Sequence, residues 1–179
     1  MRREFRLAGE GGQGLITAAI ILAAAAAEHT DLNVVQTQSY GPESRGGASR
    51  ADVIISDEDI DYPEVRTPEV LLVMAQEASD RYGPGLAKGG TLIVDTTYVD
   101  RVPQVAAKVV KYPISQKARE LGREIVANIV ALGLLVGVTG CVPAGAALQA
   151  VLSRVPKGTE ELNTRAFHSG LEAAKEVVA

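Results

Sequence analysis

The stretch Gly9-Glu10-Gly11-Gly12-Gln13-Gly14 decides the fold of this 179-residue chain. It separates a short apolar segment, 5–8, from an alanine-rich segment, 15–28, and its glycines fit the spacing G-x-G-x-x-G. Glycine permits a tight turn and the close approach of a ligand, because a Cβ atom would block both. The unpaired N–H groups at the start of a following helix can bind a phosphate. We therefore expect a strand over 5–8, a helix over 15–28 and an anion-binding turn between them.

A dinucleotide-dependent dehydrogenase is disfavoured by the second strand. Such enzymes place an acidic residue at the end of that strand, where it binds the ribose hydroxyls. Here the strand expected over 32–38 ends in Gln36-Thr37-Gln38, and Asp31 precedes it. The glycine stretch alone is weak evidence, so a tight strand-to-helix turn that binds no ligand stays open.

The composition excludes several classes of protein. Hydrophobic residues make up 46% of the chain, which suffices for a packed core without disulfides or metal. A net charge of -4 and an aromatic content of 4% disfavour nucleic-acid binding. The single cysteine, Cys141, cannot form an internal disulfide and is typical of a reducing compartment. We expect it to be a buried, unreactive thiol.

Neither a membrane span nor an export signal is expected. The apolar segment 125–138 is shorter than the roughly 20 residues that cross a bilayer, and it contains Asn128. Arg2-Arg3-Glu4-Phe5 before an apolar segment resembles a twin-arginine signal, but Arg6, Glu10 and four glycines interrupt it. Cleavage after the alanines would also remove the first strand and helix. We therefore expect a cytoplasmic protein.

Strand and helix signals alternate along the chain, as in a layered α/β protein. No repeat or linker divides the chain, and the last third is helical. This pattern predicts one three-layer α/β/α domain over 1–179, Rossmann-like, with a mostly parallel or mixed sheet. The expected strands are 5–8, 32–38, 48–56, 70–75, 91–95 and 108–112; the expected helices are 15–28, one from 76 that ends before 83, 115–121, 124–139, 144–155 and 159–178.

A second glycine-rich loop, residues 39–47, follows the second strand and is called the second loop below. In a parallel sheet it would lie at the same edge as the glycine stretch. Its arginine offers a fork of donors suited to phosphate or carboxylate, and Arg50 follows five residues later. Two readings stay open: the loop binds an anionic ligand, or Arg45 pairs with a carboxylate of a partner protein. The candidate binding residues in this loop are Tyr40, Gly41, Arg45, Gly46 and Gly47.

The chain lacks the common motifs of independent catalysis. It has no C-x-x-C, no His/Cys grouping with metal spacing and no G-x-S-x-G, and His29 and His168 lie far apart. Four carboxylates within 57–61 are better read as a solvated turn than as a cation site. We therefore expect no catalytic residue and no metal ligand.

Three blocks of sequence together resemble the gamma subunit of 2-oxoacid:ferredoxin oxidoreductases. They are the glycine stretch, the block from Gln38 to Gly47, and Asn128-Ile129-Val130-Ala131-Leu132-Gly133; the later Asn163-x-x-Ala166-Phe167 looks like that family's C-terminal helix. The pattern looks closest to the 2-oxoglutarate type. Pyruvate, 2-oxoisovalerate and indolepyruvate enzymes have similar subunits, and they stay open as alternatives.

The resemblance implies a division of labour among subunits. Thiamine diphosphate and iron–sulfur clusters would lie on partner subunits, alpha, beta and in some cases delta, and the complex would form acyl-coenzyme A and reduce ferredoxin. This chain would contribute to assembly, and Gly9, Gly11, Gly12, Gln13 and Gly14, with the second loop, would contact coenzyme A or a neighbouring subunit. A stand-alone module that binds a nucleotide or coenzyme A is the alternative of another class.

Overall fold

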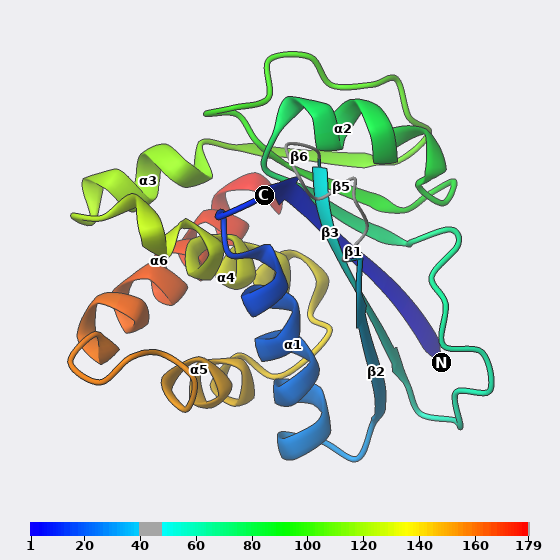
Figure 1. Ribbon diagram of the computed structural model, residues 1–179, viewed down its shortest axis with the longest axis horizontal. Helices are drawn as coiled ribbons and strands as arrows, with labels where there is room; N and C mark the ends of the chain where they lie inside the picture. Colours follow the sequence, from blue (N-terminus) through cyan, green and yellow to red (C-terminus); the bar gives the residue numbers. More distant parts are fainter. Residues whose placement is uncertain (40–47, 179) are drawn as a thin grey trace.

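The computed structural model describes residues 1–39 and 48–178 (Figure 1). The strands are β1 (Arg2–Glu10), β2 (Asn33–Gln38), β3 (Ala48–Ser56), β4 (Val70–Val73), β5 (Thr91–Asp95) and β6 (Lys108–Tyr112). The helices are α1 (Leu15–His29), α2 (Gln76–Tyr82), α3 (Ile114–Glu120), α4 (Ala127–Thr139), α5 (Ala144–Leu152) and α6 (Glu160–Val178). Short 3-10 turns, η2 (Gly83–Gly85) and η3 (Glu124–Val126), follow α2 and precede α4.

All six strands form one mixed sheet in the order β2-β3-β1-β4-β5-β6. Strand β3 is antiparallel to both β2 and β1, whereas the pairs β1-β4, β4-β5 and β5-β6 are parallel. Because β2 and β1 both oppose β3, they run in the same direction and end at the same edge of the sheet. We call this edge, where β1, β2, β4 and β5 end, the carboxyl edge.

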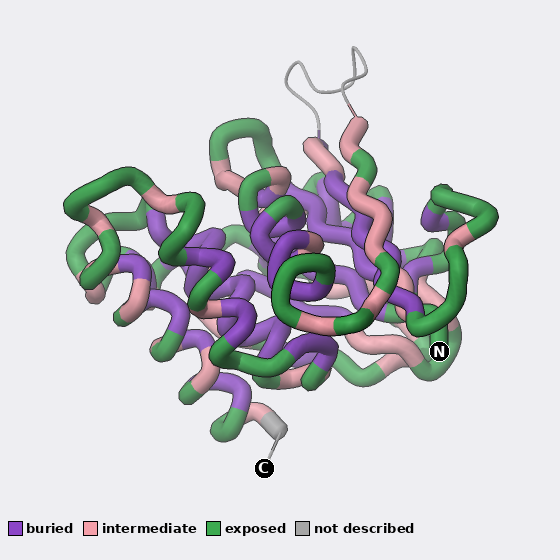
Figure 2. Tube along the Cα trace, turned by 90° about the horizontal axis from the view of Figure 1, so that it is seen from below, coloured by how far each residue is buried: buried purple, intermediate pink, exposed green. Residues whose placement is uncertain are grey.

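The sheet separates two helical layers of unequal thickness. Helices α1, α3, α4, α5 and α6 cover one face and bury the larger core, which includes Phe5, Leu7 and Leu72. The other face carries only α2, η2 and irregular segments, over a smaller core that includes Leu71 and Val73. Figure 2 shows the buried positions running through the sheet and the inner sides of the helices. The predicted α/β/α arrangement, with a helical C-terminal third, is confirmed.

Helices α4 and α6 pack closely through two glycines. A Cβ atom on Gly133 would collide with the carbonyl oxygen of Phe167, and one on Gly170 would lie 2.6 Å from the amide nitrogen of Leu134. Close backbone approach of this kind requires that neither residue carry a side chain. Helix α4 contains only 13 residues and is buried along most of its length. Within 1–39 and 48–178, no helix is long and apolar enough to cross a membrane.

Strand β1 is longer than the sequence predicts. The apolar segment 5–8 lies at its centre, and the strand continues from Arg2 to Glu10. Arg2, Glu4 and Arg6 alternate with the apolar residues and lie on the sheet face opposite α1. An apolar run marks only the doubly buried part of a strand, whereas this face is polar and is covered by other segments of the chain.

Candidate functional site

The glycine turn (residues 9–14) joins β1 to α1 at the carboxyl edge (Figure 1). Gly12 and Gly14 have φ angles of 93° and 77°, in the left-handed region that favours glycine. Gly11 does not lie in that region, and a Cβ atom built on it would meet no atom within 4 Å. Nothing in the described part of the chain therefore requires the absence of a side chain at Gly11.

Gln13 holds the glycine turn against the neighbouring strand. Its Oε1 accepts a hydrogen bond from the Glu10 amide at 2.7 Å, and its Nε2 donates to the Met74 carbonyl oxygen at 2.8 Å. A Cβ atom on Gly9 would collide with Gln13 Oε1, so Gly9 leaves room for this side chain. The sequence predicts that Gln13 contacts a ligand or partner. In the structure both polar ends of its amide are engaged within the chain.

Asn128, at the start of α4, holds the other end of the glycine turn. Its Nδ2 donates to the carbonyl oxygen of Gly14 at 3.1 Å. A Cβ atom on Gly14 would lie 2.7 Å from that nitrogen, so Gly14 is required by its neighbour as well as by its φ angle. No side chain caps the start of α1, and its first turn contains no acidic residue. The positive end of the α1 dipole therefore faces the turn without compensation from its own helix.

Two neighbouring cavities flank the glycine turn and share Gln13 and Glu124 as lining residues. One, of about 260 Å³, is lined by Gly12, Gln13, Met74, Ser115, Glu124, Ile125 and Ala127. The other, of about 330 Å³, is lined by Glu10, Gln13, Ala75, Gln76, Tyr98 and Glu124. Among these described residues no arginine or lysine lines either cavity, and two of them are carboxylates. The cavities therefore favour neutral groups, and an anion here depends on the start of α1 and on cations from elsewhere.

Tyr98, Arg119 and Glu124 form a polar cluster at the rim of these cavities. Arg119 Nε donates to Glu124 Oε2 at 2.6 Å, and the Tyr98 hydroxyl donates to Glu124 and accepts from Arg119. Two hydrogen bonds lower the pKa of Glu124 below its ordinary value: the one from Arg119 has the larger effect, and the one from Tyr98 has the smaller. The hydrogen bond to Glu124 raises the pKa of Tyr98. At neutral pH the cluster therefore holds an anionic Glu124 and a protonated Tyr98.

The second loop starts and ends at the carboxyl edge, beside the glycine turn. The Ser39 amide donates to the Arg50 carbonyl oxygen at 3.1 Å, and Ala48 pairs with Glu10 in the β1-β3 register. The residues that flank the loop are thus where the sequence predicts them. The candidates Tyr40, Gly41, Arg45, Gly46 and Gly47 lie outside the described residues.

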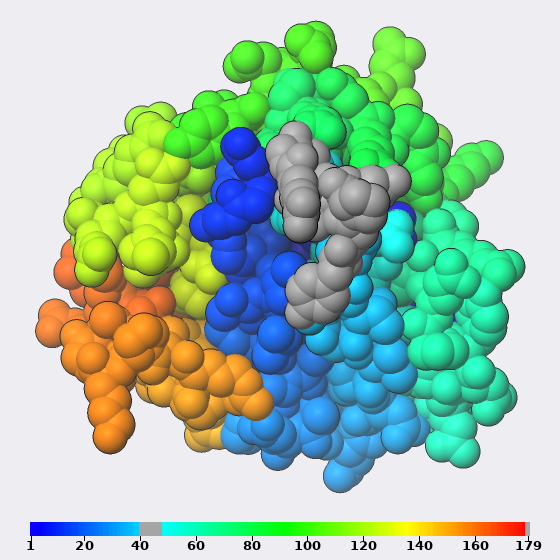
Figure 3. All heavy atoms as spheres, viewed as in Figure 1, coloured from blue at the N-terminus to red at the C-terminus, as the bar shows by residue number. Residues whose placement is uncertain are grey.

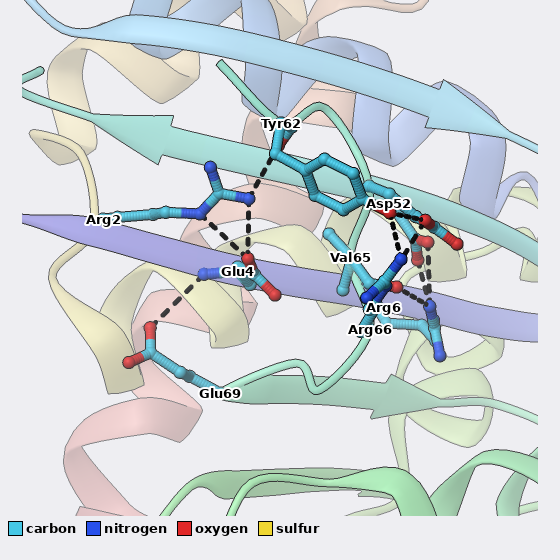
Figure 4. A network of polar contacts seen from close by, with 9 residues as sticks. Arg2, Glu4, Arg6, Asp52, Tyr62, Val65, Arg66 and Glu69 are labelled. Carbon is cyan, nitrogen blue, oxygen red and sulfur yellow. Dashed lines mark hydrogen bonds and ion pairs between the residues drawn. The ribbon is translucent and has the colours of Figure 1, made fainter. Parts of the chain in front are cut away.

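The α2-facing side of the sheet contains a buried ion pair (Figure 4). Arg6 donates from Nε to Asp52 Oδ1 at 2.8 Å and from Nη2 to Asp52 Oδ2 at 2.9 Å, and Nη2 also donates to the Val65 carbonyl oxygen at 2.8 Å. Arg50 Nε lies 3.6 Å from Asp52 Oδ2, and its guanidinium lies 5.9 Å from the ring centre of Tyr82. The pair joins β1, β3 and the segment after β3, so its role is structural.

The sequence does not single out Tyr98, Glu124 or the Arg6–Asp52 pair. Tyr98 and Glu124 are 26 positions apart and meet only through the tertiary fold. The alternation of Arg2, Glu4 and Arg6 is the one local signal for the ion-pair face, since a strand places alternate residues on one side.

The remaining candidates are the single cysteine, the two histidines and the acidic segment 57–61. Cys141 is buried, and this burial raises the pKa of its thiol. His29 and His168 are exposed, as are the carboxylates within 57–61. In the part of the chain that the structure describes, no group of three or more His, Cys, Asp or Glu side chains could hold a metal ion.

Comparison with known proteins identifies relatives over the whole chain. The profile of the family "Pyruvate ferredoxin/flavodoxin oxidoreductase" matches residues 4–173. The chain is 48% identical to 2-oxoglutarate synthase subunit KorC of Methanocaldococcus jannaschii, across 99% of this chain and 96% of that protein.

Two solved structures share the fold. The gamma subunit of a keto/oxoacid ferredoxin oxidoreductase from Geobacter sulfurreducens superposes with a TM-score of 0.92 at 47% identity, covering 99% of this chain and 98% of that one. The 2-oxoglutarate:ferredoxin oxidoreductase of Magnetococcus marinus, solved with 2-oxoglutarate, coenzyme A and succinyl-CoA bound, superposes with a TM-score of 0.86 at 25% identity. That match covers 98% of this chain but 31% of the longer one.

Proposed function

Because this chain belongs to the pyruvate ferredoxin/flavodoxin oxidoreductase family, we propose that it is the gamma subunit of a 2-oxoglutarate:ferredoxin oxidoreductase. The observation that carries this proposal is the match to the KorC subunit across 99% of this chain and 96% of that protein. The likeness to a separate gamma subunit at a TM-score of 0.92 supports it. Enzymes that use pyruvate, 2-oxoisovalerate or indolepyruvate are the alternative within the family.

The proposal divides the reaction among several chains. Alpha and beta subunits, with or without a delta subunit, bind thiamine diphosphate and the iron–sulfur clusters and pass electrons to ferredoxin. Coenzyme A supplies the thiol that receives the acyl group. The single cysteine supports a cytoplasmic location.

At the carboxyl edge, we propose that the glycine turn and the second loop meet either coenzyme A or the cofactor-bearing subunit. The N-terminus of α1, which has no side-chain cap among the described residues, favours an anionic ligand, and Arg45 would supply the cation that the described lining lacks. Glu10 and Glu124 oppose a phosphate placed directly in the cavities, and they favour a neutral part of the ligand or a partner surface there.

Purification of the tagged chain from its own cells, followed by native mass spectrometry, tests the subunit assignment. We expect copurification with larger chains that carry thiamine diphosphate and iron–sulfur clusters. The purified complex should reduce ferredoxin faster with 2-oxoglutarate than with pyruvate, 2-oxoisovalerate or indolepyruvate. A lone chain, or a simple homo-oligomer, would contradict the assignment and favour the stand-alone module.

Substitution of Arg45 in the assembled enzyme separates the two versions of the site. If the loop binds coenzyme A, Arg45→Ala raises the apparent KM for coenzyme A and leaves assembly intact. Arg45→Lys then restores only part of the affinity, because a point charge cannot replace a bidentate fork. If the loop binds a neighbouring subunit, the same substitution weakens assembly. If neither property changes, both versions of the site are wrong.

A further inference from the structure

A third cavity, here called the helical groove, lies between α1, the start of α4 and the α5–α6 turn. It has a volume of about 410 Å³, and Figure 3 shows the three segments side by side on one face of the molecule. Its floor is apolar and is formed by Ile21, Val126, Ile129 and Leu162. Thr17, on the exposed side of α1, lies at its rim.

Two buried asparagines line the helical groove with acceptors that are not used. Asn128 and Asn163 are 8% and 5% exposed. Their Nδ2 atoms donate within the chain, to Gly14 and to Thr159. Their Oδ1 atoms accept no hydrogen bond from any residue in 1–39 or 48–178. Neither oxygen is among the buried side-chain atoms that lack a partner, so both are open to solvent in the groove, where N–H or O–H donors of an occupant can reach them.

The rim of the helical groove combines a free cation with exposed apolar surface. Arg123 forms no ion pair with a carboxylate of the described residues, whereas Arg154, across the groove, pairs with Glu28 at 2.7 Å. Ile125, which also lines the groove, is 70% exposed. An occupant that covers Ile125 and places a carboxylate near Arg123 would complement this rim.

We propose that the helical groove receives a peptide segment of a partner subunit, an inference that rests on the proposed function. The segment projects an aliphatic side chain onto the apolar floor, directs main-chain N–H groups at the two asparagine oxygens and pairs a carboxylate with Arg123. A peptide fits better than a small molecule, because the exposed side chain of Ile125 extends the apolar surface beyond the cavity. Asn128 also holds Gly14, so docking in the groove steadies the glycine turn.

Two exposed groove positions and one distant control test this proposal in the assembled complex. Thr17→Arg obstructs the rim, and Arg123→Glu reverses its charge. Lys108→Glu, at an exposed position at the start of the edge strand β6 and outside the groove lining, makes the same change in net charge as Arg123→Glu. Native mass spectrometry over a dilution series measures how much of this chain stays bound. We expect each groove variant to weaken association about tenfold or more, and the control to match the unmodified chain.

Hydrogen–deuterium exchange gives a second test, which compares the unmodified chain in the complex and in isolation and needs no groove variant. Amides in 17–21, 123–129 and 154–163 should exchange more slowly in the complex than in the isolated chain. The same segments in the isolated Lys108→Glu variant should exchange as they do in the unmodified chain.

Each contrary outcome has a distinct meaning. If the unmodified chain binds no larger partners, the subunit assignment is wrong, and so is the proposal that a partner's peptide occupies the groove. If the complex forms and both groove variants behave like Lys108→Glu, the groove proposal alone is wrong. If the groove variants assemble normally but have a raised KM for coenzyme A, the groove binds a small molecule and the peptide proposal is wrong. If the chain forms a homodimer that Thr17→Arg dissociates, a second copy of the chain occupies the groove and the peptide proposal is wrong.

Discussion

The glycines of the turn at 9–14 differ in what the fold demands of them. Gly12 needs a left-handed backbone, Gly14 needs that backbone and room for Asn128, and Gly9 needs room for Gln13. Gly11 has neither constraint. No described residue requires the absence of a side chain at Gly11, so substitution there is the sharpest probe of what approaches the turn.

We expect Gly11→Leu to leave stability nearly unchanged and to impair either coenzyme A affinity or assembly. The physical reason is that a leucine side chain at this position meets none of the described residues and obstructs what approaches the turn. Chemical unfolding, the KM for coenzyme A and native mass spectrometry measure the three properties. Gly145→Leu is the matched control, since Gly145 is also exposed and unobstructed but lies in α5. Normal affinity and assembly in Gly11→Leu would show that nothing approaches the turn closely.

Breaking the buried Arg6–Asp52 pair should destabilise the chain strongly. Asp52→Ala leaves the Arg6 guanidinium buried without its bidentate partner, which costs about 3–5 kcal/mol. The double variant Arg6→Met with Asp52→Leu should lose much less, because no uncompensated charge remains. Urea unfolding of the three proteins measures the difference. If the double variant were as unstable as Asp52→Ala, the unpaired charge would not be the cause.

Cys141 should resist alkylation in the folded protein across the neutral pH range. Burial raises the pKa of its thiol, so the reactive thiolate forms only at higher pH than in an unfolded chain. Labelling with iodoacetamide at pH 8, followed by intact mass measurement, should show almost no adduct before denaturant is added and one adduct afterwards. Fast labelling of the native chain would place the thiol at the surface.

At the scale of elements, helix α4 depends on a backbone contact with α6 more than on its own sequence pattern. Gly133 and Gly170 face each other across the helix pair, where Cβ atoms would strike main-chain atoms that cannot move aside. The segment reads as a uniformly apolar buried helix, and its sequence does not say which neighbour it meets. Asn128 at its start is the polar exception, and its bond to Gly14 sets where α4 meets α1.

Gly170→Ala should lower the free energy of unfolding by about 3 kcal/mol. This is the upper end of the cost of overpacking a core, because the added methyl group would strike backbone atoms. Thermal and urea unfolding measure the loss. Gly145→Ala, in the exposed first turn of α5, is the control and should be neutral or slightly stabilising, since alanine is the better helix former. Equal stability of the two variants would mean that α4 and α6 can separate without cost.

At the scale of the whole molecule, the two faces of the sheet are covered unequally. Helices α1, α3, α4, α5 and α6 bury the larger core, whereas α2, with seven residues, covers the smaller one together with η2 and irregular segments. Local opening costs least where few apolar contacts hold a segment. The thin face should therefore open without unfolding the rest.

We expect amides in α2 to exchange through local opening at a lower free energy than amides in α4. Native-state hydrogen exchange in low concentrations of denaturant measures both. The α4 amides should follow global unfolding, whereas the α2 amides should exchange with little dependence on denaturant. A single free energy for both helices would show that the thin layer unfolds together with the main core.

The sequence alone determined the elements whose signals are local. Strands β3, β5 and β6 have the predicted bounds because their apolar runs end at turn residues, and α1 starts where the glycine turn predicts. The glycine turn, the absence of reactive motifs and the family resemblance were also readable, since each depends on residue type and spacing.

Only the tertiary structure decided what meets across the chain. The insertion of β3 between β2 and β1, against both of their directions, depends on hydrogen bonds between strands, which no local pattern encodes. The Arg6–Asp52 pair, the Tyr98–Arg119–Glu124 cluster and the helical groove join residues from separate elements. The hydrogen bonds of Gln13 to Glu10 and Met74 likewise depend on the tertiary fold, whereas its place in the glycine turn predicts a contact with a ligand or partner. Local chemistry sets the elements, and long-range packing sets which side chains remain available to a partner.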